Sequence, residues 1–210
     1  VHGGAADATR ASTAEASLPE RRLQHGDAKR AIGAAAAAIL GSDFRGSVFI
    51  DAGTTPAAVA AELPAVLGDG TRPIEVVTHS IEAAHLLAGD DRVSLTIVGG
   101  RVRGVTAAAV GAHTVRAIAE LRPDIAFVGT NGISAGFGLS TPDPEEAAVK
   151  AAVIRSARRI VVVADAAKFG GELLVRFARL DEIDALVTDA AAPHDLARAL
   201  ADADVEVVVA

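Results

Sequence analysis

Small and hydroxylated residues follow a short apolar run near the start of the chain, in the stretch "FIDAGTT" that precedes Pro56. Asp51 and Gly53 come first, and Thr54 and Thr55 lie directly before the proline. Proline suits the first position of a helix, which predicts Thr55 as the N-cap. The free N–H groups and the positive end of such a helix attract anions. The stretch therefore predicts a phosphate-binding turn, although an ordinary capped helix has the same pattern.

Similar clusters of small or polar residues follow four later apolar runs. They are Thr78, His79 and Ser80; Gly99, Gly100 and Arg101; Gly129, Asn131 and Gly132; and Asp165 with Lys168. Lys150 lies in a helical segment, four residues after Glu146, so a helical ion pair is its ordinary interpretation. A solvated loop charge is the ordinary interpretation of Lys168. In the functional interpretation, both ammonium groups reach a bound anion.

The motifs that would indicate a nucleotide, a metal or a nucleophile are missing from the sequence. The glycines of "GGRVRG" are wrongly spaced for a dinucleotide-binding loop, and no phosphate loop ending in Gly-Lys-Ser/Thr occurs. The six histidines show no zinc-binding spacing, and no Gly-x-Ser-x-Gly elbow is present. We therefore expect no cofactor and no metal, and the predicted anion belongs to a small molecule.

Alternating strands and helices must position these clusters. Apolar strand-like runs occupy residues 47–52, 74–80, 93–100, 124–132, 159–165, 184–189 and 205–210, and helical patterns occupy 27–40, 56–67, 81–89, 110–121, 143–157 and 193–203. This alternation predicts an α/β fold with an open, mostly parallel sheet and helices on both faces. Ligands bind such sheets at the carboxyl ends of the strands, where the clusters lie.

Composition narrows the class of protein. The chain has 210 residues, half of them hydrophobic, and a formal net charge of −7, which makes it a poor nucleic-acid binder by itself. No apolar run is long enough to span a bilayer, so no membrane partner is expected. The sequence has no Cys, which is typical of a cytoplasmic protein. It also has no Met, not even at position 1, which we interpret as the loss of an earlier segment.

Taken in order, the clusters resemble the C-terminal effector-sensing domain of the DeoR family of bacterial transcriptional regulators. The motifs that carry the resemblance are "FIDAGTT", "VVTHS", "IVGG", "VG", "DIAFVGTNGIS", "AAVKAAVIRSA", "VVVADAAKFG" and "LDEIDALVTD". The resemblance implies a fold related to ribose-5-phosphate isomerase and the CoA transferases, and a phosphorylated sugar or related metabolite as the ligand. It also adds Asp124 to the ligand-binding residues named above, with Lys150 and Lys168 as the cations.

The resemblance also implies how the chain is organised. Residues 1–26 would be a linker and a remnant of the DNA-binding domain, since "VHGGA" looks like the last strand of the family's winged helix-turn-helix. Residues 27–210 would be the sensor domain. Operator DNA would then be bound only through the absent domain, by a homo-oligomeric repressor of sugar utilisation. The family usually has Asn in place of His79, and Ser in place of Ala166 and Ala167.

Two alternatives belong to other classes of function. The first is a sugar-phosphate isomerase, which needs a positioned general base. The isomerases carry further acidic residues shortly after the position that matches Asp124, and here "DIAFVGTNG" has none. The second is an assembly module, in which the alanine-rich segment 31–40 is a seam between subunits. Packing of this segment within the same chain is the simpler interpretation.

Overall fold

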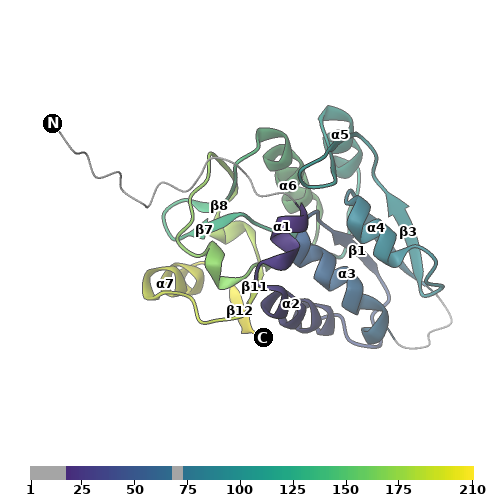
Figure 1. Cartoon of the computed structure of the whole chain (residues 1–210). Coiled ribbons are helices and arrows are strands. Elements are labelled where there is room, and N and C mark those ends of the chain that lie inside the picture. The colour runs from purple at the N-terminus through teal and green to yellow at the C-terminus, as the bar shows by residue number, and fades with distance from the viewer. Residues whose placement is uncertain (1–17, 68–72) are drawn as a thin grey trace.

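The computed structural model describes residues 18–67 and 73–210, so the "VHGGA" segment lies outside the described residues. The main sheet consists of β1 (Ser47–Ile50), β2 (Ile74–Thr78), β3 (Val93–Ile97), β6 (Ile125–Gly129), β9 (Ile160–Val163), β11 (Ala185–Thr188) and β12 (Glu206–Val209). Its order is β12-β11-β9-β6-β1-β2-β3, and every neighbouring pair is parallel (Figure 1). The predicted parallel sheet is confirmed.

Helices cover both faces of this sheet, because side chains alternate along each buried strand. Phe49 of β1 lies in one hydrophobic core, whereas its neighbours Val48 and Ile50 lie in the other. The core around Val48 is covered by α2 (Gly26–Ala38), α3 (Thr54–Val66) and α4 (Ile81–Leu87). The core around Phe49 is covered by α5 (Ala112–Ala119), α6 (Pro144–Ser156) and α7 (His194–Asp202). Two apolar faces on each strand explain the nearly continuous apolar runs.

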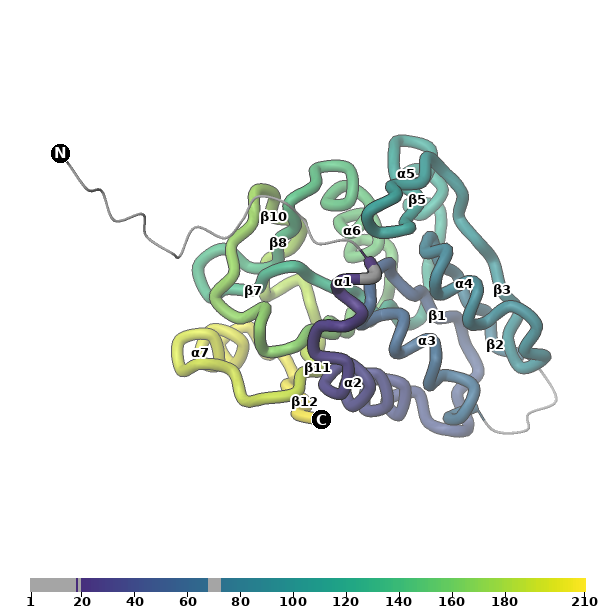
Figure 2. Tube along the Cα trace, in the orientation of Figure 1, coloured from purple at the N-terminus to yellow at the C-terminus, as the bar shows by residue number. Residues whose placement is uncertain are grey.

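Several short elements are not predicted by the alternating pattern. They are the antiparallel sheet of β7 (Gly132–Ser134), β8 (Gly138–Thr141) and β10 (Val175–Ala178), the hairpin of β4 (Arg101–Arg103) and β5 (Ala108–Val110), the helix α1 (Leu18–Leu23), and the 3₁₀ turns η1 (Ala166–Lys168) and η2 (Leu180–Glu182). Most have only three or four residues, too few to establish a period. Helix α1 lies beside the start of α3 (Figure 2).

The predicted start of α3 is wrong by two residues. Gly53, rather than Thr55, is the N-cap, and Pro56 is the third residue of the helix. Gly53 has φ 125° and ψ 164°, a backbone conformation that L side chains rarely adopt, and this allows the helix to begin directly after it. Pro64 does not break α3, which continues to Val66, because the proline lies in the last turn. The described residues include no helix long and apolar enough to cross a membrane.

The alanine-rich segment packs within the chain. Ile32, Ala36 and Ala37 are buried in the core that α2 shares with α3. At Gly33 the two helices approach so closely that a Cβ would lie 2.7 Å from the carbonyl carbon of Ala58. This contact supports intramolecular packing of the segment rather than a seam between subunits.

We expect Gly33→Ala to lower the free energy of unfolding by about 1–2 kcal/mol, since overpacking costs about 1–3 kcal/mol and helix propensity returns about 1 kcal/mol. Urea denaturation checks this. The control is Ala34→Gly on the exposed face of α2, which should lose at most about 1 kcal/mol through propensity alone. If Gly33→Ala instead stabilises the protein, the close packing of α2 on α3 is contradicted.

Candidate functional site

A small cavity lies where the strand order changes direction. From β1 the chain proceeds to β2 and β3 on one side, and later to β6 and β9 on the other, which is where ligands bind in such sheets. The cavity measures about 40 Å³ and is termed the switch-point cavity below. It is lined by Arg21, Gln24, His25, Lys29, Ala52, Gly53, Thr54, Thr55, Pro56, Thr106, Gly129, Thr130, Asn131, Glu146, Lys150 and Lys168.

One wall of the cavity is the first turn of α3. The first N–H groups of a helix have no partner within the helix, so those of Thr54 and Thr55 are available to a ligand. The positive end of the α3 helix dipole lies at this turn and favours an anion. Gly129 faces this turn from the end of β6, and a Cβ there would lie 3.0 Å from Cγ of Pro56. A larger residue than glycine would therefore push the two walls apart.

Asp51 is fully buried beside the cavity and holds the side chains of Lys150 and His79. Its carboxylate contacts Lys150 Nζ, His79 Nε2 at 2.8 Å and the backbone N–H of Gly129 at 2.9 Å. Burial alone would raise the pKa of Asp51. The charge of Lys150 and the hydrogen bond from His79 outweigh burial and lower this pKa to about 2. Asp51 is therefore an anchor for Lys150 and His79 and is not available as a general base.

His79 replaces the asparagine expected from the family resemblance, and both of its ring nitrogens face acceptors. Nδ1 lies 2.8 Å from the carbonyl oxygen of Ala109, and Nε2 lies 2.8 Å from the Asp51 carboxylate. The backbone N–H of Ala52 also donates to Nε2 at 3.2 Å. The imidazole ring is therefore fixed in the core by contacts at both nitrogens, and it connects the end of β1 to β5 behind the cavity.

Lys168 provides an ammonium group that remains for a ligand. Its side chain lines the cavity and forms no hydrogen bond or ion pair with any residue in 18–67 or 73–210. Glu146 supplies the one carboxylate of the lining, and it already accepts hydrogen bonds from Thr106 Oγ1 and, at 3.2 Å, from Arg103. The lining therefore has a clear excess of positive charge, which suits an anionic ligand.

The cavity brings together several residues predicted from the sequence, namely Gly53, Thr54, Thr55, Gly129, Asn131, Lys150 and Lys168. The predicted cluster after β2 lies outside the lining and has structural partners. Thr78 Oγ1 donates to the carbonyl of Ile50 at 2.6 Å, and Ser80 Oγ accepts from the N-terminal turn of α4. Together with His79, these residues support the ends of β1 and β2 rather than line the cavity.

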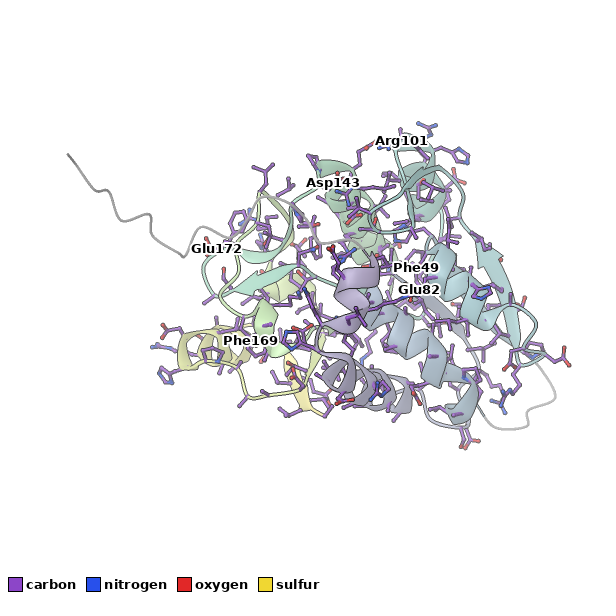
Figure 3. All side chains as sticks on the ribbon, in the orientation of Figure 1. Phe49, Glu82, Arg101, Asp143, Phe169 and Glu172 are labelled. Atoms are coloured by element: carbon purple, nitrogen blue, oxygen red, sulfur yellow. The ribbon has the colours of Figure 1, made fainter. Side chains whose placement is uncertain are left out.

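Other predicted residues also lie away from the cavity. Gly99 and Gly100 pack against Thr114, which donates to the Gly99 carbonyl at 2.9 Å. Arg101 pairs with Glu145 at the outer end of the molecule (Figure 3). Gly132 lies in β7, where a Cβ would meet the Gly171 carbonyl at 2.4 Å.

The structure does not bring Asp124 to the cavity. Asp124 precedes β6 and therefore lies at the amino end of the parallel sheet, opposite the carboxyl ends of the strands. Its carboxylate accepts from the backbone N–H of Ser47 at 2.9 Å and from the hydroxyl at 2.8 Å. These hydrogen bonds lower the pKa of Asp124. Asp124 secures the starts of β1 and β6.

Asp165 follows β9 and is 1% exposed, yet neither carboxylate oxygen has a hydrogen-bond partner among the described residues. It lies outside the cavity lining. Buried carboxylates are normally hydrogen-bonded, so this group has the capacity to accept a donor.

A set of residues from α1 and the start of α2 was missed by the sequence reasoning. Arg21, Gln24, His25 and Lys29 line the cavity, although they lie in or beside a segment that reads as a linker. The available signal is the cluster of basic residues in "RRLQHGDAKR" within an acidic chain. Thr106 was also missed, because the hairpin of β4 and β5 was not predicted, and Glu146 of α6 was considered only as a helical partner of Lys150.

Comparison with known families and proteins gives concordant matches. The family model described as DeoR C terminal sensor domain matches residues 24–190. The HTH-type transcriptional regulator GlpR of Haloferax volcanii is 36% identical over 208 residues, which cover 99% of this chain and 78% of that protein. The glycerol-3-phosphate regulon repressor of Haemophilus influenzae is 36% identical over 142 residues, 68% of this chain and 53% of that protein.

One solved structure shares the fold at low sequence identity, and a second is similar over a smaller part of the chain. A chain of the tetrameric eIF2B-beta2-delta2 complex from C. thermophilum has a TM-score of 0.55 and 13% identity, with 88% of this chain and 63% of that chain covered. Ribose 5-phosphate isomerase A from Methanocaldococcus jannaschii has a TM-score of 0.47 and 18% identity, with 70% and 55% covered.

Proposed function

This chain belongs to the DeoR family of transcriptional regulators as its C-terminal sensor domain, and on that premise we propose that the switch-point cavity binds a phosphorylated sugar or a related metabolite. The observation that carries the proposal is that Lys168 lines the same cavity as the first turn of α3 and has no side-chain partner among the described residues. The ammonium group and the helix N–H groups converge on one cavity, an arrangement suited to phosphate.

The relatives favour regulation over catalysis. The two sequence relatives reported above, from Haloferax volcanii and Haemophilus influenzae, are named as a regulator and a repressor of transcription, and neither is named as an enzyme. Within the site, Asp51 is held between Lys150 and His79 and cannot abstract a proton while it is so bound. A glycerol-3-phosphate regulon repressor among the relatives makes glycerol 3-phosphate the first ligand to test.

In the proposed function, the ligand biases the binding of operator DNA by a domain outside this chain. The ligand must bind one conformation more tightly than another, since otherwise nothing is transmitted. We infer a cytoplasmic repressor of sugar utilisation that works as a homo-oligomer. Support for assembly comes from the two open edges of the sheet, where Ile97 of β3 and Val209 of β12 are exposed.

Asp165 is proposed as the acceptor for a hydroxyl group of the sugar. Its two carboxylate oxygens lack partners among the described residues, and a polyol supplies the donors that they need. The phosphate and the hydroxyl groups would then be recognised by different ends of one site.

A thermal-shift screen tests the proposal. The chain is heated with glycerol 3-phosphate, fructose 1-phosphate, fructose 6-phosphate, ribose 5-phosphate, and tagatose and galactitol phosphates, and with each free polyol or sugar. A ligand at about 100 times its Kd stabilises the folded state by about 2.7 kcal/mol, which raises the midpoint by several degrees. We expect one phosphorylated compound to raise the midpoint and its free form to leave it unchanged. Equal shifts with the free and phosphorylated forms would contradict phosphate recognition.

A further inference from the structure

The switch-point cavity is too small for the ligand proposed above. It measures about 40 Å³, whereas pockets for small molecules typically measure about 300–1,000 Å³. A sugar phosphate therefore fits only if one wall of the cavity moves outward.

One wall that belongs neither to a central strand nor to a core helix is the segment of residues 18–25, termed the α1 arm below. Leu23 is 88% exposed. The Leu18 N–H donates to the Val105 carbonyl at 3.0 Å, Arg21 reaches the same carbonyl, and Arg22 pairs with Glu82 at 2.7 Å. The other walls are the ends of β1 and β6, the start of α3, α6, the loop at Thr106 and the turn η1 with Lys168.

A change of backbone direction separates the arm from α2. His25 has φ 55° and ψ 39°, the left-handed region that few residues other than glycine adopt, and Gly26 follows it. Helix α1 therefore does not continue into α2, and the arm can turn at this junction without disturbing the packing of α2 on α3.

Lys29 connects the fixed and the movable parts. It lies in α2, is buried, and donates from Nζ to the carbonyls of Arg21 at 2.5 Å and Gln24 at 2.6 Å. Carbonyls at the end of a helix have no partner within the helix, so these two bonds hold the end of α1. Lys29 also lines the cavity, so the same ammonium group is within reach of a ligand.

The surroundings of Lys29 favour an anionic partner. Burial lowers the pKa of Lys29; the charge of Asp165 opposes this, and the charges of Lys168 and Arg21 add to the lowering. Neutral carbonyls compensate a buried ammonium less well than a phosphate does, because a phosphate adds the Coulomb attraction of an opposite charge to its hydrogen bonds.

We propose that Lys29 is a latch whose ammonium group holds the α1 arm over the cavity or binds the ligand's phosphate, so that ligand binding releases the arm. This inference rests on the proposed function, because it needs an anionic ligand in the cavity. Coupling between two sites is reciprocal, so a contact that holds the arm in place also lowers the affinity for the ligand. The ligand thus acts on the α1 arm. In the sequence, the arm follows residues 1–17, which precede the region matched by the sensor-domain model.

Hydrogen exchange of the backbone amides, measured with and without glycerol 3-phosphate or inorganic phosphate, tests the latch. In the parent protein, we expect the probe to slow exchange at residues 53–57 and to accelerate it at residues 19–24. In Lys29→Met without a probe, exchange at residues 19–24 should already be at least about tenfold faster, since two hydrogen bonds to a charged group are lost. The probe should then cause no further acceleration there.

Arg30→Met is the matched control, because Arg30 lies next to Lys29 in α2 but pairs with Asp27 on the surface. In Arg30→Met, the amides of residues 19–24 should exchange at the same rate as in the parent protein. The latch is overturned if Lys29→Met leaves these residues protected, or if the probe slows their exchange in the parent. The comparison without probe depends on the latch alone, whereas protection at residues 53–57 reports on the proposed function.

Discussion

Lys168→Ala is expected to weaken the binding of the phosphorylated ligand about 10- to 150-fold, equivalent to about 1.5–3 kcal/mol for hydrogen bonds to a charged group. The large effect follows from the partners of the cations in the cavity. Lys150 is held by Asp51 and the Gly129 carbonyl, and Lys29 by the carbonyls of the arm, whereas Lys168 has no partner among the described residues. Isothermal titration with the ligand identified by thermal shift gives the affinity.

The matched control for this measurement is Arg101→Ala. Arg101 was also predicted to bind the ligand, but it pairs with Glu145 outside the cavity lining. Its removal should change the affinity less than about twofold, because exposed ion pairs contribute little. Both variants should unfold at the midpoint of the parent protein when no ligand is added. An unchanged affinity in Lys168→Ala would refute its role as the phosphate ligand.

Asp51→Ala should cost about 3–5 kcal/mol in the free energy of unfolding, the usual consequence of leaving buried charges without their partner. The carboxylate is fully buried and joins Lys150 to His79, so its removal leaves the buried Lys150 ammonium without its counter-charge and the His79 ring without a partner at Nε2. Urea denaturation of the ligand-free protein measures the loss. Asp124→Ala, which removes the hydrogen bonds to Ser47 and an exposed ion pair with Arg158 at the opposite edge, should cost about 1 kcal/mol.

The double variant Asp51→Ala/Lys150→Met separates the charge effect from other losses. Removing one cation together with the anion should restore part of the stability, since neighbouring groups are not additive. The pKa of Asp51 is lowered to about 2, so its contribution is complete above its ordinary value of 3.8 and is lost as the pH falls toward 2. If Asp51→Ala lowers the free energy of unfolding no more than Asp124→Ala does, the contacts of Asp51 with Lys150 and His79 do not contribute the stability proposed here.

The fold could be predicted from the sequence because its main signals are local and repeated. Each central strand is a short β-branched run with two apolar faces, and β1 and β2 are followed directly by the helices α3 and α4. The short strands β4, β5, β7, β8 and β10 lack such a signal. Their pairing depends on contacts between distant segments, such as that between β8 and β10.

The candidate site was predictable in part, for the same reason. Residues directly after β1 and β6 lie at the cavity because parallel strands end at one edge of the sheet, as Gly53 and Gly129 do. Asp124 lies before its strand and is therefore at the other edge. Arg21 reaches the cavity because the chain changes direction at His25, and the cluster of basic residues in "RRLQHGDAKR" is a weak signal that this linker-like segment returns to the site.

The position of the cavity at the junction of β1 and β6 has a consequence for how the protein becomes competent to bind. In the central pair, Val48 lies opposite Ile125, so the two halves of the cavity come from chain segments separated by β2, β3 and all the intervening helices. Closing such a long loop is costly in entropy and slow, because local contacts cannot compensate until the strands have paired. Neither half alone contains both the α3 turn and Gly129. During synthesis, ligand recognition can therefore begin only after the chain has been made as far as Lys168 and β6 has paired with β1.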